Sequence, residues 1–331
     1  MTDAHSEIPA IDIAPFLNGD EADKRAVAEA VAKACREIGF LVISGHGLPK
    51  EALDTAISKG FDFFDLSSEV KSKWHPTGTA RQRGYHRVAT RSLASTIGEK
   101  TPPDLRESVF LGPVDDHRTH YAHLPEAETA YAANIVPDEP AGFDSARVDL
   151  YRGFERLSLD MLRIFAVALD LPESHFQPLM TRHFSIFGMH HYPVLEADAE
   201  PGQLRAGAHT DFGAMTILAM TEGKGGLEAR TPDGRWAPVL PKPGDLVVNL
   251  GDMMERWTND RWVSTLHRVV VPETGDAQSR RMSIGFFVHP NFDADIRCIP
   301  SCLEDGAAPR HPDITAGGHI RMKIDASHKA A

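Results

Sequence analysis

The stretch GAHTDFGAMTILAM, residues 207–220, places a histidine and a carboxylate two positions apart at the head of an apolar run. Side chains alternate between the two faces of a strand, so His209 and Asp211 would point to the same side of a sheet. An imidazole and a carboxylate on one side can bind a metal ion. The H-x-D pattern alone is a weak signal, because a polar strand end without metal explains it equally simply.

A second histidine could complete a metal site. His267 lies near the start of another apolar stretch, STLHRVVVP. Two histidines and one carboxylate form the facial triad that suits Fe(II) and leaves three coordination positions open for substrate and oxygen. The same ligand types also bind Zn²⁺, so residue identity leaves both metals open.

An arginine and a serine follow in the next β-rich stretch, RRMSIGFF. If this stretch is a strand, Arg281 and Ser283 share a face. An inward guanidinium in a β-core is costly unless it meets an anion. Arginine offers a two-pronged donor to a carboxylate, and serine adds a hydroxyl. A metal triad with such an anchor could chelate a keto acid at iron.

The elements that must position these residues are short strands. From about residue 183, β-rich runs alternate with the turn pieces KGG, PDGR and KPGD. Regular short strands with frequent turns predict a jelly roll rather than a parallel α/β sheet. Helical spacing predicts helices over 22–40 and 51–74, whereas 75–140, rich in Pro, Gly, Asp and His, is expected to form long loops.

The strongest helical pattern covers residues 145–171, where apolar residues recur every three or four positions. Asp144 or Ser145 is expected to cap its N-terminus. Such a helix predicts a scaffold lying along the sheet. The expected fold class is therefore α+β: a double-stranded β-helix (jelly-roll) core with an α-rich N-terminal region and supporting helices.

Composition narrows the functional classes. The chain has 331 residues, 42% hydrophobic and 25% charged, as in an ordinary soluble globular protein. A net charge of -12 argues against non-specific binding to nucleic acid or anionic lipid. No apolar run approaches the roughly 20 residues of a membrane span, and the acidic N-terminal segment lacks a signal pattern. Three cysteines are too few for a disulfide framework, so we expect a cytoplasmic protein. We expect it to be a monomer or a small homo-oligomer.

Taken in order, these motifs resemble the iron(II)/2-oxoglutarate-dependent oxygenases, specifically the isopenicillin N synthase-like branch. The N-terminal matches are IPAIDIAPF, CREIGFLVISGHGLP and RGYHRV; the C-terminal ones are HYP, HTDFGAMTIL, KPGDLVVNLGDMMERWTND, TLHRVVVP and RMSIGFF. The resemblance implies four parts: an N-terminal non-haem dioxygenase region (1–125), linking loops with the scaffold helix (126–182), the Fe(II)/2-oxoglutarate dioxygenase β-core (183–292) and a C-terminal segment (293–331).

The resemblance also implies roles for particular residues. Iron would be held by His209, Asp211 and His267, and the distal carboxylate of 2-oxoglutarate by Arg281 and Ser283.

Tyr192, in HYP, matches a tyrosine that commonly assists the cosubstrate. The family often has asparagine two residues earlier, where this chain has His190. His190 shares a strand face with Tyr192, so we expect it to line the cosubstrate side of the pocket without being a fourth iron ligand.

Three further residues are expected near the substrate: Phe287 and Phe212, which match or adjoin aromatic positions of the family's pocket, and Arg87, which could reach an anionic substrate. Asn249 and Asp252 are expected to support the site as turn formers rather than as ligands.

The implied activity is that of an Fe(II)/2-oxoglutarate-dependent dioxygenase. With Fe(2+), 2-oxoglutarate and O2, such an enzyme oxidises, most simply hydroxylates, a small molecule while 2-oxoglutarate is converted to succinate and CO2. Two alternatives remain open. A 2-oxoglutarate-independent Fe(II) oxidase or cyclase of the same family could use Arg281 and Ser283 for its own substrate, and a non-catalytic β-sandwich could bind a ligand. The sequence does not indicate which molecule is the substrate.

Overall fold

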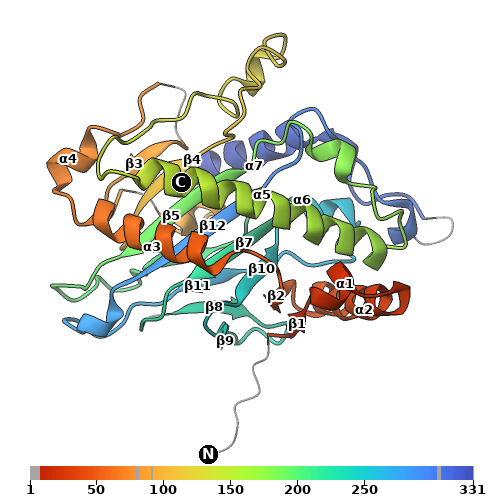
Figure 1. The fold of residues 1–331 in the computed structure, drawn as a ribbon, viewed down its shortest axis with the longest axis horizontal. Coiled ribbons are helices and arrows are strands. Elements are labelled where there is room, and N and C mark those ends of the chain that lie inside the picture. The colour runs from red at the N-terminus through yellow and green to blue at the C-terminus, as the bar shows by residue number, and fades with distance from the viewer. Residues whose placement is uncertain (1–7, 79–81, 91, 225, 304–306, 331) are drawn as a thin grey trace, which may run out of the picture.

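Two β-sheets form the centre of the molecule, and helices cover the outer face of the larger sheet (Figure 1). The computed structural model describes residues 8–78, 82–90, 92–224, 226–303 and 307–330. This arrangement is the α+β jelly roll that the sequence predicts. Among the described residues, no helix is long and apolar enough to span a membrane.

The larger sheet has eight strands, in the spatial order β1 (Ala10–Asp12), β2 (Phe40–Ser44), β10 (Leu246–Leu250), β7 (Met215–Met220), β12 (Arg281–Val288), β5 (Ile186–Tyr192), β4 (Glu107–Leu111) and β3 (Gly84–His86). The smaller sheet has the order β6 (Ala206–His209), β11 (His267–Val269), β8 (Leu227–Arg230) and β9 (Trp236–Pro238). A separate pair is formed by β13 (Asp295–Ile296) and β14 (Ile314–Thr315).

The helices are α1 (Ala14–Asn18), α2 (Glu21–Glu37), α3 (Lys50–Phe64), α4 (Ser68–Ser72), α5 (Phe143–Ala168), α6 (Asp252–Trp257) and α7 (Ala316–Ala330). The 3₁₀ helices are η1 (Leu93–Ile97), η2 (Pro125–Ala127), η3 (Gln177–Met180), η4 (Ala277–Ser279) and η5 (Pro300–Cys302). The region 51–74 thus forms two helices, α3 and α4.

The long helix α5 crosses the larger sheet and packs beside α2 and α3 (Figure 1). Its predicted apolar stripe is buried, and the ring of Phe154 stacks on Phe286 of β12 at 5.9 Å. The predicted cap is wrong. The helix begins at Phe143 after Gly142, and no side chain of the described residues caps it. Asp144 lies inside the first turn and pairs with the buried Arg147 instead.

The prediction of irregular loops over 75–140 is also wrong in part. This region supplies β3 and β4, and β4 extends the larger sheet by pairing with β5. Both strands are short, and β5, the partner of β4, is distant in the sequence. Local pattern therefore carries little signal for strands that gain their stability from distant partners.

Side chains alternate along each strand, so the larger sheet has an outer face and an inner face. Along β5, Phe187 and Met189 belong to the apolar core under the helices, while Tyr192 belongs to a smaller apolar cluster with residues of both sheets. That second cluster also contains Phe40 and Val247 from the larger sheet. The inner face is thus enclosed between the sheets, and residues of the even-numbered positions of β5 point into it.

A buried charge network holds β4, β5 and α4 together on the outer face. The carboxylate of Glu107 accepts hydrogen bonds from Lys71 Nζ at 2.8 Å and from the Tyr85 hydroxyl at 2.5 Å. Its other oxygen lies 2.8 Å from His191 Nδ1. Burial alone would raise the pKa of Glu107, but the hydrogen bonds from His191, Lys71 and Tyr85 outweigh it and hold this pKa below its usual value.

We expect the substitution Glu107→Gln to destabilise the fold by about 3 kcal/mol at neutral pH, because it leaves the Lys71 ammonium buried without its counter-charge. A depressed folded-state pKa stabilises the protein above the ordinary glutamate value of 4.5. That contribution is lost as the pH falls through the lower folded-state value. Urea unfolding at a series of pH values should therefore show the gap between wild type and variant closing in acid.

The exposed pair of Asp116 and Arg118 offers a control, since Asp116→Asn should leave the unfolding midpoint almost unchanged at neutral pH. A Glu107→Gln protein as stable as wild type at pH 7 would contradict the role of the network.

Candidate metal centre

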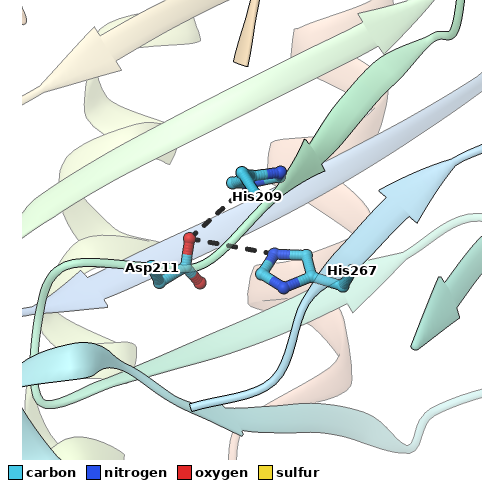
Figure 2. Close-up of side chains that lie close together, drawn as sticks. All are labelled: His209, Asp211 and His267. Atoms are coloured by element: carbon cyan, nitrogen blue, oxygen red, sulfur yellow. Dashed lines mark ion pairs between the residues drawn. The ribbon is translucent and has the colours of Figure 1, made fainter. Parts of the chain in front are cut away.

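Three side chains from two neighbouring strands and the following loop converge on one point (Figure 2). His209 ends β6, and its register partner on the antiparallel strand β11 is His267. Asp211 lies two residues beyond His209, and its Oδ1 is 3.8 Å from Nε2 of each histidine. Ligand atoms of the three residues lie within 4.8 Å of one another. The carboxylate–imidazole separations of 3.8 Å are shorter than twice an ordinary metal–ligand bond of about 2.0–2.2 Å, so the carboxylate and either imidazole can share one metal ion.

Backbone carbonyl groups orient both imidazoles. His209 Nδ1 lies 2.8 Å from the carbonyl oxygen of Gly207, and His267 Nδ1 lies 3.0 Å from that of Thr265. A carbonyl oxygen only accepts hydrogen bonds, so each Nδ1 carries the proton and each Nε2 presents a lone pair. Both lone pairs are then available on the side of Asp211, as in protein sites where a second hydrogen bond fixes the histidine ligand.

The two oxygens of the Asp211 carboxylate have different surroundings. Oδ2 accepts hydrogen bonds from the Thr216 hydroxyl at 2.5 Å and from the Asn249 amide at 2.8 Å. Thr216 on β7 and Asn249 on β10 are register partners in the larger sheet. Oδ1 is left facing the histidines. Asn249 thus supports the site, as predicted, although from within a strand rather than a turn.

Asp252 also supports the site without facing the metal position. It begins α6, its backbone N–H donates to the carbonyl oxygen of Asp211 at 2.7 Å, and its carboxylate accepts from Thr210 Oγ1 at 3.1 Å. Lys323 of α7 forms an ion pair with the same carboxylate. The C-terminal helix is thereby fastened next to the loop that carries Asp211.

The electrostatic environment puts two of the ligands, His209 and Asp211, into metal-binding form. Burial, together with the nearby His267, lowers the pKa of His209 to about 3, so this imidazole is neutral at pH 7. Burial would raise the pKa of Asp211, but His267, His209 and two hydrogen bonds hold it below its usual value. The carboxylate is therefore ionised. A neutral imidazole and an ionised carboxylate need lose no proton on binding a metal.

The four residues predicted for the cosubstrate come together on the inner face. In the pairing of β12 with β5, Arg281 is opposite Tyr192 and Ser283 is opposite His190. The Arg281 guanidinium is buried and lies 5.1 Å from the centre of the Tyr192 ring. Ser283 Oγ is 3.4 Å from the Tyr192 hydroxyl. Burial lowers the pKa of Arg281 from its usual value.

His190 is buried and has one hydrogen-bond partner among the described residues, the Ser108 hydroxyl at 2.8 Å from Nδ1. Its Nε2 has no partner within the same ranges. Burial lowers the pKa of His190 well below the ordinary histidine value, so the ring is neutral. The rings of Phe110 and Phe287 stand edge-on to it at 5.5 and 6.2 Å.

The residues predicted for the substrate are not all brought to this space. Phe287 lies on the inner face beside His190. Phe212 is half-buried, with Lys323 Nζ 5.5 Å from its ring centre. Arg87 is exposed, and its guanidinium donates to the hydroxyl of Ser72 at 2.6 and 2.9 Å. The structure thus gives Arg87 a contact with α4 instead of a place beside the metal ligands.

The sequence analysis did not identify two residues near the site, Thr216 and Arg106. Thr216 is the first inward position of the strand MTILAM, and its alternation with apolar neighbours could have indicated an inward hydroxyl. Arg106 directly precedes β4, a strand that was itself missed.

Fold and site together define a class, a jelly-roll protein with two histidines and one carboxylate at a metal position. The family models agree. The model for the "non-haem dioxygenase in morphine synthesis N-terminal" region matches residues 8–139, and that of the "2OG-Fe(II) oxygenase superfamily" matches 179–290. The chain belongs to the 2-oxoglutarate- and Fe(II)-dependent oxygenases, and it is an oxidoreductase that uses Fe(II), 2-oxoglutarate and O2.

Relatives extend over nearly the whole chain. The 2-oxoglutarate-Fe(II) type oxidoreductase hxnY of Emericella nidulans is 33% identical over 98% of this chain and 91% of its own. Proline hydroxylase buaE of Petromyces alliaceus is 32% identical over 90% and 92%. Among solved structures, a full-length Neurospora crassa protein in complex with α-KG and thymine has a TM-score of 0.82 at 27% identity, covering 98% of each chain.

The hydrogen bonds to Asp211 Oδ2 can be tested with the near-isosteric substitution Thr216→Val. We expect it to lower the affinity for Fe(II) by about 10-fold, because the carboxylate loses one of two groups that fix its orientation. Anaerobic equilibrium dialysis with Fe(II) measures this affinity. Thr274, whose hydroxyl binds Asp198 on an exposed loop, supplies the matched control in Thr274→Val. Equal Fe(II) affinity in both variants would show that the orientation of Asp211 does not depend on Thr216.

Proposed function

We propose that His209, Asp211 and His267 hold the Fe(II) at which this enzyme oxidises a small organic molecule. The observation that carries the proposal is the convergence of three ligand atoms, two imidazole nitrogens and one carboxylate oxygen, on one point. Two nitrogens and one oxygen suit Fe(II) and leave positions open for other ligands. Membership of the family favours Fe(II) over Zn²⁺ for the same donor set.

We assign the cosubstrate to the wall formed by β12 and β5. The Arg281 guanidinium is buried on this wall and offers a two-pronged donor that fits a carboxylate, such as the distal carboxylate of 2-oxoglutarate. Ser283 and Tyr192 bring two hydroxyl groups to the same place. When bound, Fe(II) and 2-oxoglutarate supply the O2-dependent oxidation of a C–H bond, with conversion of the cosubstrate to succinate and CO2.

His190 is proposed as a neutral hydrogen-bonding group on this wall, not as an iron ligand. The Ser108 hydroxyl can donate to Nδ1, and Nε2–H is then free to donate to an oxygen of a bound molecule, as an amide would. The low pKa supports this role, since a neutral ring adds no positive charge beside the metal.

Aromatic side chains are proposed to border the substrate. Phe287 stands beside His190, and Phe212 follows the metal ligand Asp211 directly. The names of the relatives support a small molecule as substrate, since they include a proline hydroxylase and a structure with bound thymine. Arg87 is left out of the proposed pocket because its guanidinium is exposed and donates to Ser72.

We also propose a location, an oligomeric state and a division of the chain into regions. The net charge of -12 supports a protein that binds neither nucleic acid nor anionic membranes, and we propose that it is a cytoplasmic monomer or small homo-oligomer. We also propose residues 183–292 as the functional oxygenase core, preceded by the regions 1–125 and 126–182 and followed by 293–331.

The metal assignment predicts that Asp211→Ala yields a folded protein that binds little Fe(II) and has almost no turnover. The reason is that this substitution removes the one anionic ligand of the set. Succinate formation from 2-oxoglutarate under air, measured alongside iron content, provides the test. Full succinate formation by the purified variant with iron supplied would refute the assignment.

The cosubstrate assignment predicts that Arg281→Gln raises KM for 2-oxoglutarate by about 10- to 100-fold, the effect of losing a charge-assisted contact of about 1.5–3 kcal/mol. The KM of the primary substrate should change much less. The measurement is steady-state succinate formation with each substrate varied in turn. Weakened binding of the primary substrate alone would instead support a 2-oxoglutarate-independent oxidase in which Arg281 holds the oxidised molecule.

A further inference from the structure

A second cation, Arg106, lies beside the site. It directly precedes β4, where Ser108 is the register partner of His190. Alternation continued by one step from Ser108 places Arg106 on the inner face. The preceding segment is fastened beside β6, the strand that ends in His209, because Asp104 Oδ1 accepts a hydrogen bond from the Gly207 N–H at 3.0 Å.

The chain leaves this guanidinium poorly satisfied. Its side chain is 17% exposed, and Arg106 Nε lies 3.9 Å from Asp104 Oδ2, beyond hydrogen-bonding distance. The Asp104 carboxylate already accepts from the N–H groups of Gly207 and Leu93. Within the described ranges, Arg106 has no hydrogen-bond acceptor. A guanidinium whose charged contact is this long keeps N–H donors available for an anion from outside the chain.

Contacts of the chain place Arg106 beside the site. Its Nε lies 3.9 Å from Oδ2 of Asp104, and the other oxygen of that carboxylate accepts a hydrogen bond from the N–H of Gly207, two residues before His209. Arg106 is therefore next to the strand that carries the metal ligand His209.

Arg106 and Arg281 would meet different anions. Arg281 lies on β12 and is opposite Tyr192 on β5, and the β5–β4 pairing continued by one step brings Arg106 opposite Tyr192 from the other side. Their backbones are then two strand spacings apart, roughly 10 Å. The two side chains thus start from opposite sides of Tyr192, so a cosubstrate carboxylate held by Arg281 leaves Arg106 to a different anion.

We propose that Arg106 binds the carboxylate of the primary substrate, so that this enzyme oxidises a small organic acid. The apolar part of the acid would lie against Phe110 and Phe287, which flank His190. The proposal rests on the proposed function, because it takes the metal position and the 2-oxoglutarate wall as given. Arg106 is then a specificity-determining residue, selecting acids over their neutral analogues.

The test is a binding measurement that needs no turnover. Protein loaded with redox-inert Mn(II) and saturated with 2-oxoglutarate is titrated calorimetrically with matched acids and amides: benzoate and benzamide, phenylacetate and phenylacetamide, hexanoate and hexanamide. We expect at least one acid to bind 10-fold or more tightly than its amide. In Arg106→Gln this preference should disappear through loss of acid affinity, with the affinity for 2-oxoglutarate unchanged.

Two further variants complete the comparison. Arg106→Lys keeps the charge without the two-pronged donor and should retain part of the preference for acids. Arg118→Gln removes an exposed arginine whose partner is Asp116 and should leave every affinity unchanged. If Arg106→Gln does not fold, partial loss of the preference in Arg106→Lys supports the proposal, and an unchanged preference overturns it.

Other results would overturn the inference. They are equal binding of all acids and amides by the wild type, an acid preference that survives in Arg106→Gln, and a loss of 2-oxoglutarate affinity in that variant. The last would assign Arg106 to the cosubstrate. Failure of the proposed function would look different, namely no 2-oxoglutarate-dependent succinate formation by the iron-loaded wild type, whereas acid preference is read on the Mn(II) protein.

Discussion

One carboxylate has to serve both sheets. Asp211 turns Oδ2 to Thr216 and Asn249 of the larger sheet and Oδ1 to the two histidines of the smaller sheet. If the pairing of β10 with β7 slipped by one residue, Thr216 and Asn249 would no longer be register partners and their side chains would lie on opposite faces. The metal position exists only where both sheets keep their register at once.

The two faces of the larger sheet divide stability from chemistry. On the outer face, α5 and the strands bury aromatic and aliphatic side chains, and Glu107 closes a fully bonded charge network. The inner face carries arginine, histidine and serine, groups that are costly to bury. A polar interior of this kind contributes little to folding, so the apolar outer layer must compensate for it.

The sequence predicts side-chain direction well because direction is a local property. Alternation alone placed Arg281 with Ser283 on one face. The pairing of one strand with another is not a local property. The pairing of His209 with His267 depends on the register of distant segments, and so does the existence of β3 and β4. The helix start at Gly142 was missed because the two polar residues that follow look like better caps than glycine.

The same dependence on distant partners explains why the sequence analysis named Arg87 and missed Arg106. The hydrogen-bond partners also distinguish two kinds of largely buried cation, Arg205 and Arg106. Arg205, fully buried near the Tyr192 ring, donates to the carbonyl oxygens of Lys224, Ser279 and Pro193. Burial lowers its pKa to about 10, and it stays charged at neutral pH. Three carbonyl oxygens of the chain hold its two terminal nitrogens, while Nε has no partner among the described residues, so Arg205 is a structural cation. Arg106 has a loose contact with one shared carboxylate. A cation paired so loosely beside a metal position can bind an anion that comes from outside the chain.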